Sequence, residues 1–228
     1  MNELYWVLLL LLNFGAILLS YRIFGKTGLF AWIPIAVIVA NIQVLKTIEL
    51  FGMVATLGNI VYATSFMATD ILSENHEKKD AQKAVAIGFM SLIVMTVFMN
   101  VALLFTPHES DFAHEALAKL FTVMPRIALA SLIAYLVSQM HDIKAYHFWK
   151  RKFPATRHIW LRNNASTMVS QLLDTVIFST IAFYGLFPTG VFLEIVFTTY
   201  ILKWIVAALD TPLIYLAKKL YQQGKIPV

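Results

Sequence analysis

The chain has 228 residues, of which 59% are hydrophobic and only 14% are charged. Soluble domains are about 45–50% apolar and about 25% charged, and a small domain cannot hide this much apolar surface because its surface-to-volume ratio is high. The composition therefore excludes a typical soluble enzyme, a disordered chain and a nucleic-acid-binding module. The chain has no cysteine, which excludes disulfide scaffolds and thiolate chemistry.

Apolar segments near the roughly 20 residues that cross a bilayer predict an all-α, polytopic membrane helix bundle of about seven transmembrane helices. Backbone groups in lipid must hydrogen-bond within the chain, which favours helices. The predicted spans are residues 5–21, 28–50, 53–72, 84–105, 115–140, 166–187 and 190–216. We expect Pro125 and Arg126 inside the fifth span and the largest polar loop at 141–165. The first span is a retained helix, because its positive charges follow the apolar run.

The placement of lysine and arginine predicts the orientation. Of the 18 such residues, two follow the first span, three the third, six the fifth and three the seventh, whereas the turns after the second and sixth have none. Cytoplasmic loops carry an excess of basic residues. We therefore expect the N-terminus outside and the C-terminus inside, and the formal net charge of +5 reflects topology instead of nucleic-acid binding.

The third predicted span places Tyr62, Phe66, Asp70 and Glu74 at steps of four, which puts them on one helical face. Aromatic surface followed by carboxylates suits a planar ligand with hydrogen-bond donors. Two plainer interpretations stay open: Phe66 is a packing residue, and Glu74 is a solvated or capping carboxylate. We expect Asp70 and Asp174 to project into one cavity, with Phe66 beside them.

The sixth and seventh spans also carry polar faces. Gln171 and Asp174 share a face of the sixth span, and Lys203 and Asp210 share a face of the seventh. A charge at mid-membrane costs about 2.5–3.5 kcal/mol, so such groups normally face the protein interior with partners. Asp174 and Lys203 either bind ligand or form a buried ion pair that fixes helix packing. Arg126 either satisfies carbonyls at the Pro125 kink or takes a ligand or gating role.

The sequence contains none of the common catalytic or nucleotide-binding motifs. H-E-x-x-H, G-x-S-x-G, G-x-x-x-x-G-K-[ST] and G-x-G-x-x-G do not occur. The spacing of His108, Asp111 and His114 is too generic to indicate a metal. We therefore predict no catalytic residue, metal site or cofactor, and a protein that is not an enzyme and has no nucleotide-hydrolysing motor of its own.

Several short stretches between about residues 30 and 215 occur together in a specific order. They are Ala40-Asn41, Lys46, Phe51-Gly52, Thr69-Asp70-Ile71-Leu72-Ser73-Glu74, Pro125-Arg126-Ile127, Gln139, Trp160-Leu161-Arg162, Gln171, Asp174-Thr175, Lys203 and Pro212. In this order and spacing they resemble the queuosine precursor transporter family, also called the vitamin-uptake-transporter-like family. Its architecture is similar to that of the substrate-binding subunits of energy-coupling-factor vitamin transporters. The loop after Glu74 departs from the family, which usually has Tyr-Gly there.

The resemblance implies import of 7-deazaguanine bases, such as queuine or its precursors, for the salvage of a tRNA modification. It also implies one integral membrane transport domain: an extra N-terminal helix at 1–27, a family core at 28–216 and a basic cytoplasmic tail at 217–228. The expected cellular location is the plasma (inner) membrane of a prokaryote. The expected substrate-binding residues are Asn41, Lys46, Tyr62, Phe66, Asp70, Glu74, Arg126, Gln171, Asp174 and Lys203.

Three functions stay open at this point. The first is a transporter that works alone, as a monomer or a homo-oligomer. The second is a substrate-binding subunit that needs separate ATPase and coupling subunits. The third is a membrane enzyme or assembly factor without transport. No catalytic motif in the sequence favours this option.

The distribution of basic residues generates the first prediction. A reporter fused to the N-terminus is expected to face the outside, and one fused to the C-terminus the cytoplasm. Accessibility of each fusion to a membrane-impermeant reagent in intact cells measures this. If both ends lie on the same side, residues 5–24 do not span the membrane.

Overall fold

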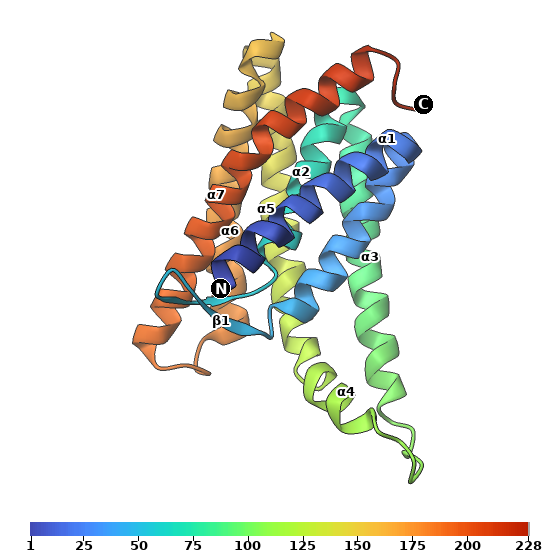
Figure 1. Cartoon of the computed structure of the whole chain (residues 1–228), viewed down its shortest axis with the longest axis vertical. Helices are drawn as coiled ribbons and strands as arrows, with labels where there is room; N and C mark the ends of the chain where they lie inside the picture. The colour runs from blue at the N-terminus through green and yellow to red at the C-terminus, as the bar shows by residue number, and fades with distance from the viewer. Residues whose placement is uncertain (228) are drawn as a thin grey trace.

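The computed structural model describes residues 1–227, and most of them are helical (Figure 1). The helices are joined by short connections, apart from one β-hairpin. In chain order the elements are α1 (Asn2–Gln43), β1 (Thr47–Leu50), β2 (Met53–Thr56), α2 (Asn59–Asn75), α3 (Lys78–Ala102), α4 (His114–Phe121), α5 (Met124–Lys152), the 3-10 turn η1 (Thr156–His158), α6 (Ile159–Phe183) and α7 (Thr189–Gln222).

Helix α1 is two helical arms joined by a sharp turn at Gly25. This residue has φ 58° and ψ −139°, which a residue with a side chain adopts only under strain. The first arm runs from the N-terminus to the turn, and the second returns alongside it to the hairpin (Figure 1). This turn lies between the first two predicted spans, 5–21 and 28–50, as expected from the sequence.

The predicted boundary between the second and third spans is wrong. Residues 47–50 and 53–56 are two paired antiparallel strands instead of helix ends. The β-branched residues of these strands suit a sheet, and the connecting Phe51 and Gly52 have positive φ values of 51° and 75°, which a tight hairpin turn requires. Helix α2 consequently begins at Asn59.

The predicted polar loop at 141–165 is also wrong. Helix α5 continues to Lys152, and α6 begins at Ile159, so only a short connection remains. The basic residues near the end of α5 are good helix formers, and the helix stops just before Pro154, which disfavours helical geometry in the residue preceding it. At the other end, Pro125 lies in the first turn of α5, where proline is well accommodated, and the apolar segment His114–Lys152 contains both Pro125 and Arg126.

Helix α2 is the centre of the bundle. All of its residues are buried, and it contacts α1, α3, α5 and α7, while α5 packs most extensively against α6. The two arms of α1 and then α2, α3, α5, α6 and α7 run in alternate directions through the bundle (Figure 1). Every residue of α2 is therefore enclosed by the rest of the protein, which allows this helix to carry polar groups.

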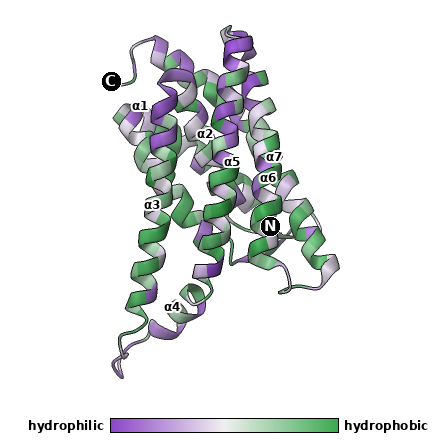
Figure 2. Cartoon of the chain, turned by 180° about the vertical axis from the view of Figure 1, so that it is seen from behind, coloured by the Kyte–Doolittle hydropathy of each residue, from purple (hydrophilic) through white to green (hydrophobic). Residues whose placement is uncertain are grey.

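The outer surface of the bundle is apolar along much of its length. Figure 2 shows hydrophobic residues over the middle of the bundle and hydrophilic residues gathered near the end that holds the C-terminus. Within the described residues, five helical segments are long and apolar enough to cross a membrane: Asn2–Gln43, Lys78–Ala102, His114–Lys152, Thr156–Phe183 and Thr189–Gln222. The protein is thus a polytopic helical membrane protein in its architecture.

The turn in α1 generates the second prediction. A Cβ atom at Gly25 would overlap the carbonyl oxygen of Pro227, so Gly25→Ala combines this clash with backbone strain of about 1–3 kcal/mol. We expect a lower melting temperature in detergent. Gly15→Ala is the matched control, because the same added Cβ meets open space in the same helix. Equal melting temperatures for the two variants would contradict the account.

Candidate functional site

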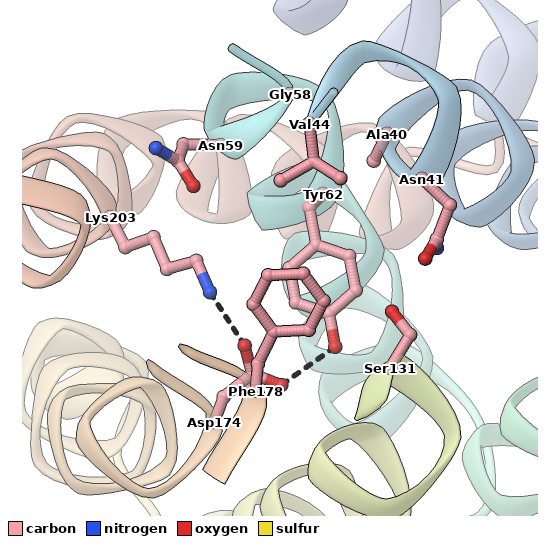
Figure 3. Close-up of a pocket in the computed structure, with 10 residues that line it drawn as sticks. All are labelled: Ala40, Asn41, Val44, Gly58, Asn59, Tyr62, Ser131, Asp174, Phe178 and Lys203. Carbon is pink, nitrogen blue, oxygen red and sulfur yellow. Dashed lines mark hydrogen bonds and ion pairs between the residues drawn. The ribbon is translucent and has the colours of Figure 1, made fainter. Parts of the chain in front are cut away.

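The Asp174 carboxylate lies at the centre of a buried polar cluster (Figure 3). Its Oδ2 accepts a hydrogen bond from Lys203 Nζ of α7 at 2.5 Å. Its Oδ1 accepts from the hydroxyls of Tyr62 of α2, at 2.8 Å, and Ser138 of α5, at 3.1 Å. Four helices therefore meet at one carboxylate.

The Lys203 ammonium group is held in two ways. Besides its ion pair with Asp174, Nζ lies 4.9 Å from the centre of the Tyr62 ring, where the ring face attracts a cation. Both charged side chains are almost wholly buried. A buried charge without a partner is strongly destabilising, so each member of the pair holds the other in the bundle.

A small cavity adjoins this cluster. Its volume is about 30 Å³, which is room for a very few water molecules, whereas ligand pockets are typically about 300–1,000 Å³. A planar base therefore enters only if the surrounding helices move apart. The residues around the cavity are Ala40, Asn41, Val44, Gly58, Asn59, Tyr62, Ser131, Asp174, Phe178 and Lys203 (Figure 3).

Of the ten expected substrate-binding residues, four lie around this cavity: Asn41, Tyr62, Asp174 and Lys203. The Asn41 amide donates to the carbonyl of Val37, and its Oδ1 is buried without a hydrogen-bond partner. This oxygen is an acceptor beside the cavity. A second aromatic ring there belongs to Phe178, so two aromatic side chains line the cavity.

Phe66 and Gln171 are buried close to the cluster but are not part of the cavity wall. Phe66 packs edge-on against Tyr62, with ring centres 5.8 Å apart. Gln171 lies about one turn from Asp174 on α6, and neither end of its amide has a hydrogen-bond partner.

Asp70 lies deeper in the bundle than the cavity. It is two helical turns beyond Tyr62 on α2, about 12 Å along the axis at 1.5 Å per residue, and its Oδ2 accepts from Thr167 at 3.3 Å. Between the two levels, Gln139 accepts from Thr69 at 3.2 Å. The central cavity therefore does not meet the expectation that Asp70 and Asp174 share one cavity, because its wall includes Asp174 and not Asp70.

Glu74 is neither solvated nor a helix cap. Its carboxylate accepts from Arg162 at 2.8 Å and from the Tyr146 hydroxyl at 3.1 Å, and it pairs with Lys218 at 3.3 Å and Lys150 at 3.9 Å. Arg162 is completely buried. These residues, which we call the inner ionic cluster, join α2, α5, α6 and α7 at the end of the bundle that holds the C-terminus.

His76 lies beside this end, in the connection between α2 and α3. Its Nε2 is 3.1 Å from the hydroxyl of Tyr21 in the first arm of α1. Burial, and then the nearby Lys26 charge, lower the pKa of His76. The imidazole is therefore neutral at pH 7 and ties α1 to the end of α2.

Arg126 and Lys46 lie away from the central cavity. The Arg126 guanidinium donates to the carbonyls of Ile181 and Tyr184, both at 2.9 Å, so it satisfies the end of α6 instead of a kink in its own helix. Lys46 lines a separate cavity of about 410 Å³ between the first arm of α1 and the hairpin.

A third cavity lies between the other two. It shares Trp6 and Leu57 with the larger one, and it shares Gly58 and Asn59 with the central one. The three cavities therefore form an interrupted path from the hairpin end of the bundle to Asp174.

Sequence reasoning missed several residues of these clusters. Ser138, Phe178 and Arg162 are not among the residues expected from the sequence, and Asp142, which is buried on α5 below Ser138, falls in the predicted loop at 141–165. A signal was present for two of them: Ser138 and Asp142 are four residues apart, so extending the fifth span by one turn would have placed both on one face.

These features define a membrane protein with a closed polar site inside a helical bundle. Residues 56–217 match the family model described as "Putative vitamin uptake transporter", and the chain belongs to this family. It is 46% identical over 219 residues to a "Probable queuosine precursor transporter" of Bacillus subtilis (strain 168), covering 96% of both chains.

Two further relatives are more distant. A "Probable queuosine precursor transporter" of Haemophilus influenzae is 29% identical over 71% of this chain and 66% of its own. A "Queuosine precursor transporter" of Escherichia coli (strain K12) is 26% identical over 74% of each chain. No solved structure matches the chain.

The Asp174–Lys203 pair generates the third prediction. Asp174→Asn leaves the buried Lys203 charge without its partner, so we expect a loss of stability of about 3–5 kcal/mol, and Lys203→Met added to it should restore part of this. If Asp174 also binds ligand, affinity should fall about ten- to a hundredfold in the single and the double variant.

Melting temperature and ligand affinity are measured on the two single variants and the double. Glu109→Gln, in an exposed loop, is the control for loss of a carboxylate and should change neither. Restored stability with unchanged ligand affinity in the double variant would leave Asp174 as a purely structural partner of Lys203.

Proposed function

We propose that the protein imports a 7-deazaguanine precursor of queuosine across the inner membrane of a prokaryote, as a transporter and not as an enzyme. The observation that carries this is the buried Asp174 carboxylate, with a lysine and an aromatic ring at its side. The names of the relatives, which are queuosine precursor transporters, support the substrate class.

The chemistry of the cluster fits such a base. A 7-deazaguanine presents a ring N–H and an exocyclic NH₂ on one edge, which Asp174 accepts in bidentate fashion. Its carbonyl oxygen accepts from Lys203, whose ammonium has more donors than its bond to Asp174 uses. Tyr62 and Phe178 offer faces to the flat ring. A ligand that leaves these buried groups unpaired is rejected.

The proposed topology has seven passes, with the N-terminus outside. The alternating directions of the arms of α1 and of α2, α3, α5, α6 and α7 support it (Figure 1), as do the lysines and arginines near the C-terminal end of the bundle. Residues 1–27 are then an additional pass before the core at 28–216, and 217–228 a cytoplasmic tail. With this orientation, the path of cavities opens outside, and the inner ionic cluster closes the cytoplasmic end.

Ligand binding and transport by the purified protein test this proposal. In detergent, 7-deazaguanine, queuine and guanine are each added and the melting temperature is followed. A specific ligand stabilises by about 2.7 kcal/mol at 100 times its Kd, and adenine, whose edge offers a different donor pattern, is the control. Proteoliposomes holding only this chain then measure uptake of the ligand that binds.

The outcomes separate the candidate functions. Binding with uptake is the expected result. Binding without uptake would favour a substrate-binding subunit that needs ATPase and coupling subunits. Absence of a shift with all three bases would overturn the proposed substrate class.

A further inference from the structure

Two carboxylates lie side by side about two helical turns inward from the Asp174 cavity, and a third lies nearby. Asp70 of α2 and Asp142 of α5 are within hydrogen-bonding reach of each other, and Asp210 of α7 is close enough to repel both. All three are almost wholly buried. We call them the carboxylate cluster.

The groups around the carboxylate cluster are nearly all neutral. Asp142 lies near the hydroxyls of Ser166, Thr167 and Ser170 on α6, but these donate to the Asn163 carbonyl, to Asp70 at 3.3 Å and to the Ser166 carbonyl, respectively. Asp210 accepts from the Asn163 amide at 2.8 Å. Within residues 1–227, the cluster's three carboxylates form no ion pair with lysine, arginine or histidine, in contrast to Asp174 and Glu74.

Several buried polar atoms at the carboxylate cluster have no hydrogen-bond partner. They include Oδ1 of Asp70 and both carboxylate oxygens of Asp142. Asn163, completely buried, points its amide at Asp210 and leaves its own Oδ1 without a partner. Buried polar groups are normally satisfied, and each exception needs an explanation. The carboxylate cluster therefore has more hydrogen-bond acceptors than donors.

A bound proton would provide the missing hydrogen-bond donor. Two carboxylates are both acceptors, so the contact of Asp70 with Asp142 becomes a hydrogen bond only when one of them carries a proton. Like charges this close in a dry interior cannot both stay ionised. A metal ion fits less well, because within the described residues no group of three or more His, Cys, Asp or Glu side chains is arranged to hold one.

The carboxylate cluster is connected to the Asp174 site through two helices. On α5, Ser138 donates to Asp174 and Asp142 follows one turn later. On α6, Asp174 and Thr167 are two turns apart, with the unpartnered Gln171 between them. A shift of α5 or α6 that opens the cavity for a base therefore moves the groups around the carboxylate pair as well.

We propose that the carboxylate cluster, with Asp70 and Asp142 as its centre, is the proton-binding site that couples substrate import to the proton gradient. This inference rests on the proposed transport function. A proton enters from the outside and binds to the carboxylate pair while the base occupies the Asp174 site. Both leave to the cytoplasm, and the unprotonated pair returns. Intramembrane carboxylates commonly serve such relays.

Other titratable and charged groups lie around the carboxylate cluster. Besides Asp210, they are His141 of α5, which hydrogen-bonds Ser170 at 2.9 Å, and Tyr146, Glu74 and Arg162 on the cytoplasmic side. The Asp174–Lys203 pair lies on the outer side. Tyr146 and Arg162 hold Glu74, Lys203 holds Asp174 and His141 has the Ser170 hydroxyl, whereas Asp70 and Asp142 have oxygens without a partner.

The fourth prediction tests this coupling in proteoliposomes loaded with an alkaline buffer. With one proton carried per neutral base, a gradient of one pH unit is expected to accumulate radiolabelled 7-deazaguanine up to about tenfold, and a protonophore should abolish this. Asp142→Asn is expected to lose the accumulation but to keep counterflow exchange and the ligand-induced thermal shift, because the Asp174 site is intact. Asp70→Asn should behave in the same way.

Glu109→Gln, which removes a carboxylate from an exposed loop, is the control and should accumulate substrate normally. Ligand-induced stabilisation of each variant shows that it is folded. Wild-type uptake that ignores the pH gradient, or that follows a sodium gradient, would overturn the proton site while leaving the transport function standing. Failure of the wild type to bind or exchange any base would instead overturn the proposed function.

Discussion

The charges buried along α2 are the constraint on which the rest of the bundle depends. A charge inside a membrane protein needs a partner, and Glu74 finds its partners on α5, α6 and α7. Near the other end of α2, the Tyr62 hydroxyl donates to Asp174, which also forms an ion pair with Lys203. The polar residues of the central helix therefore determine which faces of the surrounding helices turn inward.

The three polar levels differ in how their charge is balanced. Asp174 has a single lysine, and Glu74 is surrounded by Arg162, Lys150 and Lys218. The carboxylate cluster between them has no cation. In the proposed transporter, a substrate edge and Lys203 compete for Asp174 at the outer level, whereas the ion pairs of Glu74 hold α2, α5, α6 and α7 together at the inner level. The middle level is the one whose charge depends on protons.

The central cavity is too small to hold a substrate in the observed conformation. A volume of about 30 Å³ is far below what a ligand pocket needs, so the binding-competent form is a different arrangement of the same helices. The apparent affinity for substrate is then reduced by the fraction of molecules in that form. The Asp174–Lys203 ion pair favours the closed form, because it satisfies both charges without a ligand.

Much of the fold could be predicted from the sequence, because apolar segments mark the membrane-spanning helices and basic residues mark the loops between them. The arms of α1, together with α3 and α7, lie close to their predicted ranges. The residues 47–56 could not be assigned as readily, because a short apolar stretch is equally compatible with a helix end and a strand. The hairpin depends on the turn at Phe51 and Gly52, and Gly52 was identified only as a break.

The candidate site could be predicted in part. Asp174 and Lys203 were selected because their charges are expensive in a membrane, and the structure places them together. Asp142 was missed because the aromatic and basic residues that follow it suggested a loop, although helices often extend beyond the lipid. Phe66 and Phe178 could not be told apart by spacing, because the choice between cavity wall and packing depends on neighbouring helices.

The burial of α2 has a consequence for how the protein is made. With Asp70 and Glu74 in its last two turns, this helix gains little from lipid when it first leaves the ribosome, since charged groups are expensive to place in a membrane. The strongly apolar α3 follows after only two residues. We therefore expect the two helices to insert as one hairpin, in which α3 contributes the affinity for lipid and α5 to α7 later supply the polar partners of α2.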